Sequence, residues 1–133
     1  MAEKITWKFP PGGGHMEKPS KIYYQTMTKK DVEERLKVND ILLIPFGSTE
    51  NHGDAQPYGE DVFIVTRMCE MVAQKVGCTV AEPMWYASHP FAHLGQTGTV
   101  PISDDLTSAM VRHIVTGYWN AGFRKQILMS SHG

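Results

Sequence analysis

Three short apolar runs, separated by segments of helical periodicity, constrain this chain more than any other feature of its sequence. The runs cover residues 41–46, 78–81 and 126–130. A continuous apolar run of this length is typical of a strand buried on both faces. Amphipathic segments between such strands favour right-handed crossover connections. The sequence therefore predicts an α/β fold with a parallel sheet flanked by helices.

Capping and termination signals set the expected helix boundaries. Thr28 opens a capping-box pattern for a first helix. A long amphipathic helix is expected over residues 61–76, and Gly77 is placed to end it. Ser103 is placed to cap a further helix over residues 103–121. The strand, helix and loop signals together predict one α/β domain.

Residues 1–27 are expected to form an extended arm, and residues 28–133 the folded domain. The run Phe9–His15 contains two prolines and three glycines, which disfavour both regular helix and central strand. A glycine-rich run can cradle phosphate between a strand and a helix, but neither element flanks this one. We expect the arm to lie over the surface or on a neighbouring subunit.

Charge and composition exclude several classes of protein. Thirteen basic and fourteen acidic residues give a net charge of −1, without the basic surface expected of a nucleic-acid binder. The chain lacks the run of about 18 apolar residues that a membrane-spanning helix needs, and its N-terminus lacks a secretory signal. Cys69 and Cys78 are too few for a disulfide scaffold. We expect both to be free thiols in a reducing cytoplasm.

Ionisable residues follow two of the predicted strands. Glu50, His52 and Asp61 come after the first strand, and His132 comes after the last. Because ligands bind beyond the carboxyl ends of the strands in open α/β sheets, we expect these side chains to meet at one sheet edge. A mixed set of carboxylates and imidazoles suits zinc or manganese better than calcium. An ordinary solvated polar loop is the alternative interpretation.

The spacing of these residues resembles a family signature. The segment Pro45–Gly53, with Asp61 eleven positions after Glu50, is similar to the first motif of the creatininase (creatinine amidohydrolase) family. Ser131-His132-Gly133 matches the opening of a second family motif, and Gly95–Ile102 resembles a Gly-Thr-containing loop of the family. The resemblance covers about residues 40–133, and these residues resemble only the N-terminal half of such an enzyme, so we expect an incomplete N-terminal portion of the family fold.

The resemblance implies a three-layer fold and a metal-dependent hydrolase that opens a small cyclic substrate, a cyclic amide or a related ring, with metal-activated water. It implies two divalent ions, zinc or manganese. Glu50 and His132 would hold one ion and His52 the other, with Asp61 bridging them. The resemblance also implies a homo-oligomer, such as a hexamer.

Two departures from the family pattern modify these expectations. Ala55-Gln56-Pro57 replaces the family's His-Leu-Pro, which favours a substrate other than creatinine. A cyclic diketone derived from a sugar or inositol is one alternative. Family members are longer, and their last metal ligand, a glutamate, follows the second histidine. We therefore expect a C-terminal segment, covalent or separate, to add a carboxylate near His132. A non-catalytic binding or assembly protein that retains the fold is the remaining alternative.

The irregular stretch before the last helix holds the candidate substrate contacts. Its two histidines are four positions apart, but Pro90 between them disfavours the helix that a metal-binding pair of this spacing would need. We therefore expect both histidines to contact the substrate. Two aromatic residues nearby could wall a pocket for a ring-shaped substrate, or else pack in the core or between subunits. The candidate substrate-binding residues are His89, His93, Trp85, Tyr86 and Gln96.

Overall fold

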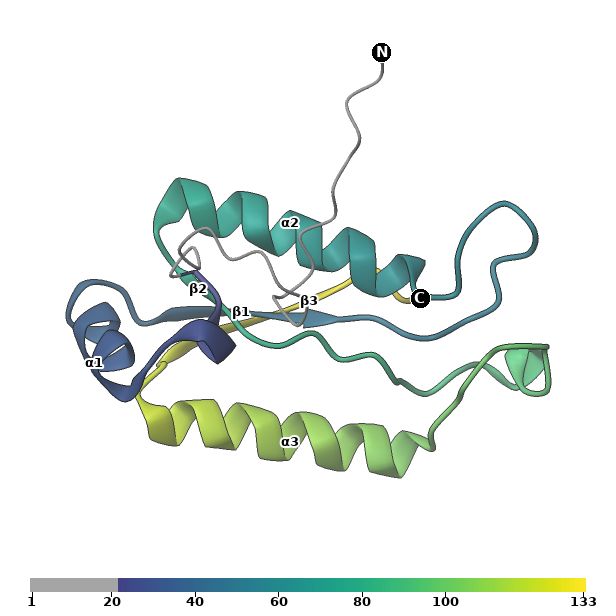
Figure 1. Ribbon diagram of the computed structural model, residues 1–133. Helices are drawn as coiled ribbons and strands as arrows, with labels where there is room; N and C mark the ends of the chain where they lie inside the picture. The colour runs from purple at the N-terminus through teal and green to yellow at the C-terminus, as the bar shows by residue number, and fades with distance from the viewer. Residues whose placement is uncertain (1–21) are drawn as a thin grey trace, which may run out of the picture.

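A parallel three-stranded sheet forms the middle layer of the computed structural model, which describes residues 22–133 (Figure 1). The central strand is β1 (Ile41–Phe46), with β2 (Thr79–Val80) on one side and β3 (Lys125–Ser130) on the other. Both neighbours run parallel to β1. The predicted parallel sheet is confirmed, with strand boundaries shifted by one residue at two of the three strands.

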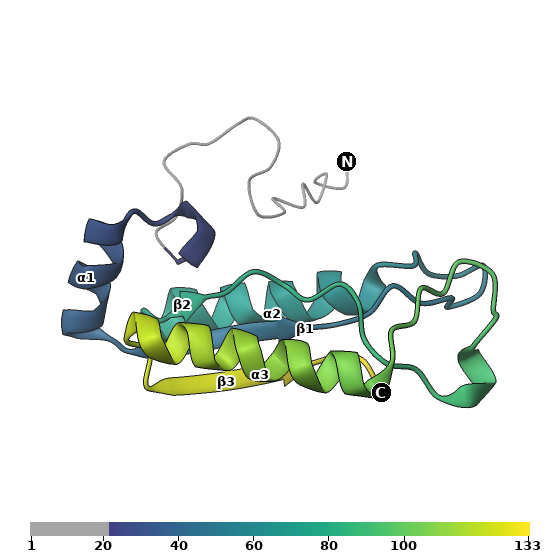
Figure 2. The same cartoon turned by 90° about the horizontal axis from the view of Figure 1, so that it is seen from below.

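Helices α2 (Glu60–Val76) and α3 (Asp104–Ala121) cover opposite faces of the sheet, which confirms the three-layer arrangement (Figure 1). Helix α2 ends at Gly77, whose φ of 69° is the left-handed conformation that glycine adopts readily. Helix α1 (Lys29–Val38) begins at the predicted capping box of Thr28 and lies near the end of the sheet where β1 starts (Figure 2). None of the helices described here is long and apolar enough to cross a membrane.

Two 3-10 helices, η1 (Tyr24–Thr26) and η2 (Phe91–His93), complete the described elements. Of the predicted arm, the described part packs beside β2, where Tyr23 forms a parallel bridge with Val80. Residues 1–21 lie outside the described residues. The extended path predicted for residues 1–27 therefore stays a prediction.

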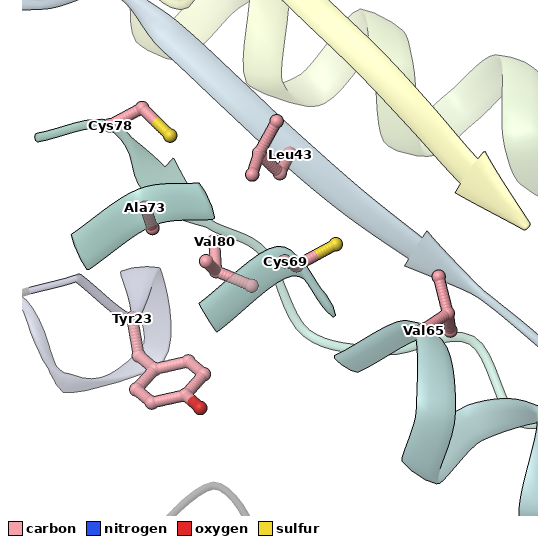
Figure 3. Packing of buried hydrophobic residues seen from close by; sticks show 7 residues of the cluster. All are labelled: Tyr23, Leu43, Val65, Cys69, Ala73, Cys78 and Val80. Atoms are coloured by element: carbon pink, nitrogen blue, oxygen red, sulfur yellow. The ribbon is translucent and has the colours of Figure 1, made fainter. Parts of the chain in front are cut away.

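The core has two halves because successive side chains of a strand point to opposite faces. Leu43 packs on the α2 side with Val65 and Cys69, as Figure 3 shows. Leu42 packs on the α3 side with Phe123, which is fully buried. Both cysteines are free, as expected from the sequence, and the structure buries them. Burial raises the pKa of the Cys69 thiol to about 12, so this thiol stays protonated and unreactive in the folded chain.

The sheet has an open edge at β3. This strand pairs with β1 along its whole length, and within residues 22–133 no strand pairs with its other side. Ile127 faces the α2 layer and Leu128 the α3 layer, yet the two side chains are 49% and 46% exposed. The two helices therefore cover β1 more completely than they cover β3.

Candidate metal centre

The end of β1 and the first turn of α2 lie in close contact beside the site. The chain leaves β1 at Gly47, and a Cβ there would lie 2.7 Å from the backbone nitrogen of Val62 and 2.9 Å from the carbonyl carbon of Asp61. Only glycine permits this contact without a backbone shift. The first turn of α2, and Asp61 with it, is thereby held against the carboxyl end of β1.

Two carboxylates are buried together at this point. Glu50 is 7% exposed and Asp61 6% exposed. The Ser48 hydroxyl joins them, because its Oγ lies 2.8 Å from Oδ2 of Asp61 and 3.4 Å from Oε2 of Glu50. Two buried carboxylates at this range repel each other unless a positive charge compensates them.

His132 faces both carboxylates from the end of β3. Its Nδ1 lies 3.1 Å from Oε2 of Glu50 and 3.3 Å from Oδ2 of Asp61. Its Nε2 lies 2.9 Å from the backbone carbonyl oxygen of Ser88. A carbonyl oxygen only accepts hydrogen bonds, so Nε2 carries the ring proton. With the proton on Nε2, Nδ1 can direct a lone pair toward the carboxylates, as metal-binding histidines do.

His52 has the same arrangement with its two nitrogens exchanged. Its Nδ1 lies 3.1 Å from the backbone carbonyl oxygen of Glu50, which fixes the proton on Nδ1. Its Nε2 lies 3.3 Å from Oδ1 of Asp61. Asp61 thus presents one oxygen to His52 and the other to His132. This is the orientation required of a carboxylate that bridges two ions.

The donor set fits divalent transition metals. Apart from the Ser48 hydroxyl, the groups that converge on Asp61 are carboxylate oxygens and imidazole nitrogens. Glu50, His52 and Asp61 offer ligand atoms within 4.8 Å of one another, and Glu50 with His89 and His132 forms a second such group. Carboxylate and imidazole ligands together suit zinc and manganese. The four predicted metal ligands therefore meet at one edge of the sheet.

The loop after β2 brings two further histidines to Glu50. Nδ1 of His93 lies 2.5 Å from Oε1 of Glu50 in an ion-pair contact, with the side chain 41% exposed. The side chain of His89 is fully enclosed, and its Nδ1 lies 3.8 Å from the same oxygen. Pro90 follows His89 directly and precedes η2, whose last residue is His93. The sequence assigned both histidines to the substrate, and that role stays a prediction.

The charges around Glu50 favour its ionised form. Burial raises the pKa of its carboxyl group, but the close contact with His93 and the nearby rings of His132 and His89 outweigh burial. The pKa of Glu50 is therefore held below its usual value. Burial also lowers the pKa of His89.

The two aromatic candidates for substrate binding line a groove that is separate from the metal-ligand cluster. Trp85 and Tyr86 line a groove of about 670 Å³ together with Tyr118 of α3, and none of the four predicted metal ligands lines it. The Trp85 ring also packs edge-on against Phe63, with centroids 5.7 Å apart. Gln96 lies exposed on the loop after η2. The structure thus gathers the two histidines at the metal-ligand cluster, whereas Trp85 and Tyr86 line the groove beside α3 and the Trp85 ring also contacts α2.

Sequence reasoning missed the serines that organise the site. Ser48 joins the two carboxylates, and the Ser88 carbonyl orients His132. The sequence carried one usable signal for Ser48, because it lies two residues before Glu50 within the motif Pro45–Gly53. The role of Ser88 carried none, since any residue supplies a backbone carbonyl.

The fold and this cluster define an α/β protein with a candidate two-ion centre at the carboxyl ends of its parallel strands. Comparison with known proteins gives the family. The family model described as creatininase, creatinine amidohydrolase, matches residues 25–133. The chain belongs to the creatininase family, as its motifs indicated.

Individual relatives extend this result. The chain is 56% identical over 118 residues to the 3-dehydro-scyllo-inosose hydrolase of Thermotoga maritima, a match that covers 89% of this chain and 38% of that protein. It is 26% identical over 116 residues to the creatinine amidohydrolase of Pseudomonas putida, over 84% of this chain and 45% of that one. A crystal structure of creatinine amidohydrolase superposes with a TM-score of 0.79 at 25% identity, with 84% of this chain and 45% of that one covered. The chain spans less than half the length of these curated relatives.

Proposed function

We propose that this chain is part of a metal-dependent hydrolase that opens the ring of an inositol-derived cyclic diketone. The observation that carries the proposal is the position of Asp61, whose two oxygens each face a ring nitrogen of a different histidine. The 56% identity to an inosose hydrolase supports the diketone over a cyclic amide. The altered segment Ala55–Pro57 supports the same choice.

Two divalent ions fit the ligand set. In this proposal Glu50 and His132 hold one ion, His52 holds the other, and Asp61 contacts both. Zinc and manganese are the favoured metals, since similar solved creatininases are named as a manganese form and as a zinc–zinc form. Such ions, when bound, acidify water and polarise a carbonyl group.

The ion beside His52 needs more ligands than the described residues offer. A zinc ion usually takes about four ligands, whereas His52 and Asp61 are two groups. We propose that a segment after Gly133, covalent or separate, adds a carboxylate near His132. The open edge of β3 supports this, because a further strand there would cover the exposed Ile127 and Leu128.

The proposed ring-opening reaction needs a group that holds a proton. Hydrolysis of a cyclic 1,3-diketone joins the oxygen of water to one carbonyl carbon and breaks the bond from that carbon to the carbon between the two carbonyls. The electron pair stays on the central carbon as an enolate, which then takes a proton. The products are a carboxylate and a ketone in one open chain. His93 is our candidate to hold that proton, on the ring nitrogen that does not face Glu50.

The substrate contacts follow from exposure. His93 and Gln96 lie on an accessible loop. The loop after β1 contacts it, because the backbone nitrogen of Asn51 donates a hydrogen bond to Oγ1 of Thr99 over 3.0 Å. Trp85 and Tyr86 would contribute through the neighbouring groove. We further propose a homo-oligomer, and a cytoplasmic location that agrees with the two free cysteines.

The test uses this chain together with its natural downstream sequence, purified and loaded with manganese or zinc. We expect kcat/KM for an inositol-derived 1,3-diketone to exceed that for creatinine by at least about 100-fold, which lies well within the discrimination of a site built to hydrogen-bond its substrate. A preference for creatinine would contradict the diketone proposal and indicate a cyclic amide as the substrate. Metal-loaded protein that hydrolyses neither compound would favour the non-catalytic alternative.

A further inference from the structure

His89 has an enclosed side chain whose ring nitrogens lack a hydrogen-bond partner among the described residues. Its side chain has no exposed surface. Within residues 22–133, neither ring nitrogen makes a hydrogen bond. Enclosing two unpaired ring nitrogens carries a desolvation penalty, which a ligand on one of them would offset. An enclosed imidazole is also poorly placed to contact a substrate that enters from solvent.

The surroundings of His89 indicate which ligand would bind there. Its Nδ1 lies 3.8 Å from Oε1 of Glu50, and its ring packs edge-on against His132 with centroids 4.8 Å apart. Glu50, His89 and His132 can each direct a ligand atom to within 4.8 Å of the others. A carboxylate and two imidazoles at this range form the kind of ligand set that holds a transition-metal ion.

We propose that His89 is an additional protein ligand of the ion held by Glu50, Asp61 and His132. This inference rests on the proposed function, since the ion belongs to the same hydrolytic centre. With His89 the ion has four protein ligands, which is the usual number for zinc. The ion beside His52 shares only Asp61 with it. The two ions are therefore held unequally, and the one bound by His89 is the tighter.

Two substitutions separate ligation from packing. His89→Ala removes the ring, and His89→Phe removes both nitrogens but keeps a ring packed against His132. His113→Ala is the matched control, because His113 is an exposed histidine of α3. All variants are made in the chain with its natural downstream sequence. Circular dichroism shows whether each one folds.

Metal affinity is measured by competition with a chelator, and coordination by the visible absorption of the cobalt-substituted protein. We expect both His89 variants to lower the affinity for the more tightly bound ion by more than about 100-fold. This exceeds the usual effect of changing an outer-sphere residue. The cobalt bands of that ion should also change, and the control should match the wild type.

If either His89 variant folds and keeps wild-type affinities and cobalt bands, the inference is wrong. A raised KM with unchanged metal binding would also overturn it and assign His89 to the substrate. Wild-type protein that binds no ion would count instead against the proposed function.

Discussion

Replacing Asp61 with asparagine should remove at least one bound ion per chain and lower the rate of hydrolysis by more than about 100-fold, since it changes a direct ligand rather than an outer-sphere group. Asparagine keeps the size of the side chain and can still accept the hydrogen bond from Ser48. It lacks the negative charge and the second anionic oxygen that His52 and His132 face. The effect would therefore report metal binding and not packing.

The measurement is metal content per chain together with kcat, in the protein with its natural downstream sequence. Asp54→Asn serves as the control, because Asp54 is an exposed carboxylate in the same loop between β1 and α2. The control should keep both the metal and the activity. An Asp61→Asn protein with wild-type metal content and turnover would show that Asp61 does not bridge ions.

Gly47→Ala should disable the site although it changes none of the proposed metal ligands. The added methyl group would lie 2.7 Å from the backbone nitrogen of Val62, where the main chain must shift because it cannot rotate away. Overpacking of this kind typically costs about 1–3 kcal/mol of stability. The shift moves the first turn of α2 and pulls Asp61 away from Ser48 and His132. A displacement near 1 Å is sufficient for a loss of about 100-fold in rate.

Gly117→Ala is the matched control for this prediction. A Cβ at Gly117 meets no atom within 4 Å, and alanine favours the helix by about 0.5–1 kcal/mol. Thermal unfolding, metal content and turnover should therefore stay at or above wild-type levels in the control. Equal metal affinity in Gly47→Ala and Gly117→Ala would mean that the contact between β1 and α2 does not position Asp61.

The elements were predictable where local patterns decide them. The run at residues 41–46 is apolar on both faces because β1 lies between α2 and α3. Helix α2 follows the predicted period and ends at Gly77 as expected. The partial exposure of β3 was less predictable from its own residues. A strand with an open edge and a strand in the middle of a sheet share the same apolar run.

The candidate site was predictable as far as its motif spacing reached. Glu50 and His132 meet because two parallel strands end at one edge of the sheet. The enclosure of His89 was not predictable, because residues 82–102 lack the periodicity that would fix their path. Tertiary hydrogen bonds set that path, as when the backbone nitrogen of Ile102 donates to the carbonyl oxygen of Ala87 over 3.1 Å. Such contacts depend on residues far away in the sequence.

Elemental analysis of the natively purified protein tests the central claim most directly. The carboxylate oxygens and histidine nitrogens around Asp61 form a candidate ligand set, so we expect at least one divalent transition-metal ion per chain to remain bound after gel filtration. Treatment with a chelator should remove it, and added manganese or zinc should restore it. Protein that is free of metal as purified, and that takes up neither manganese nor zinc when they are added, would contradict the account.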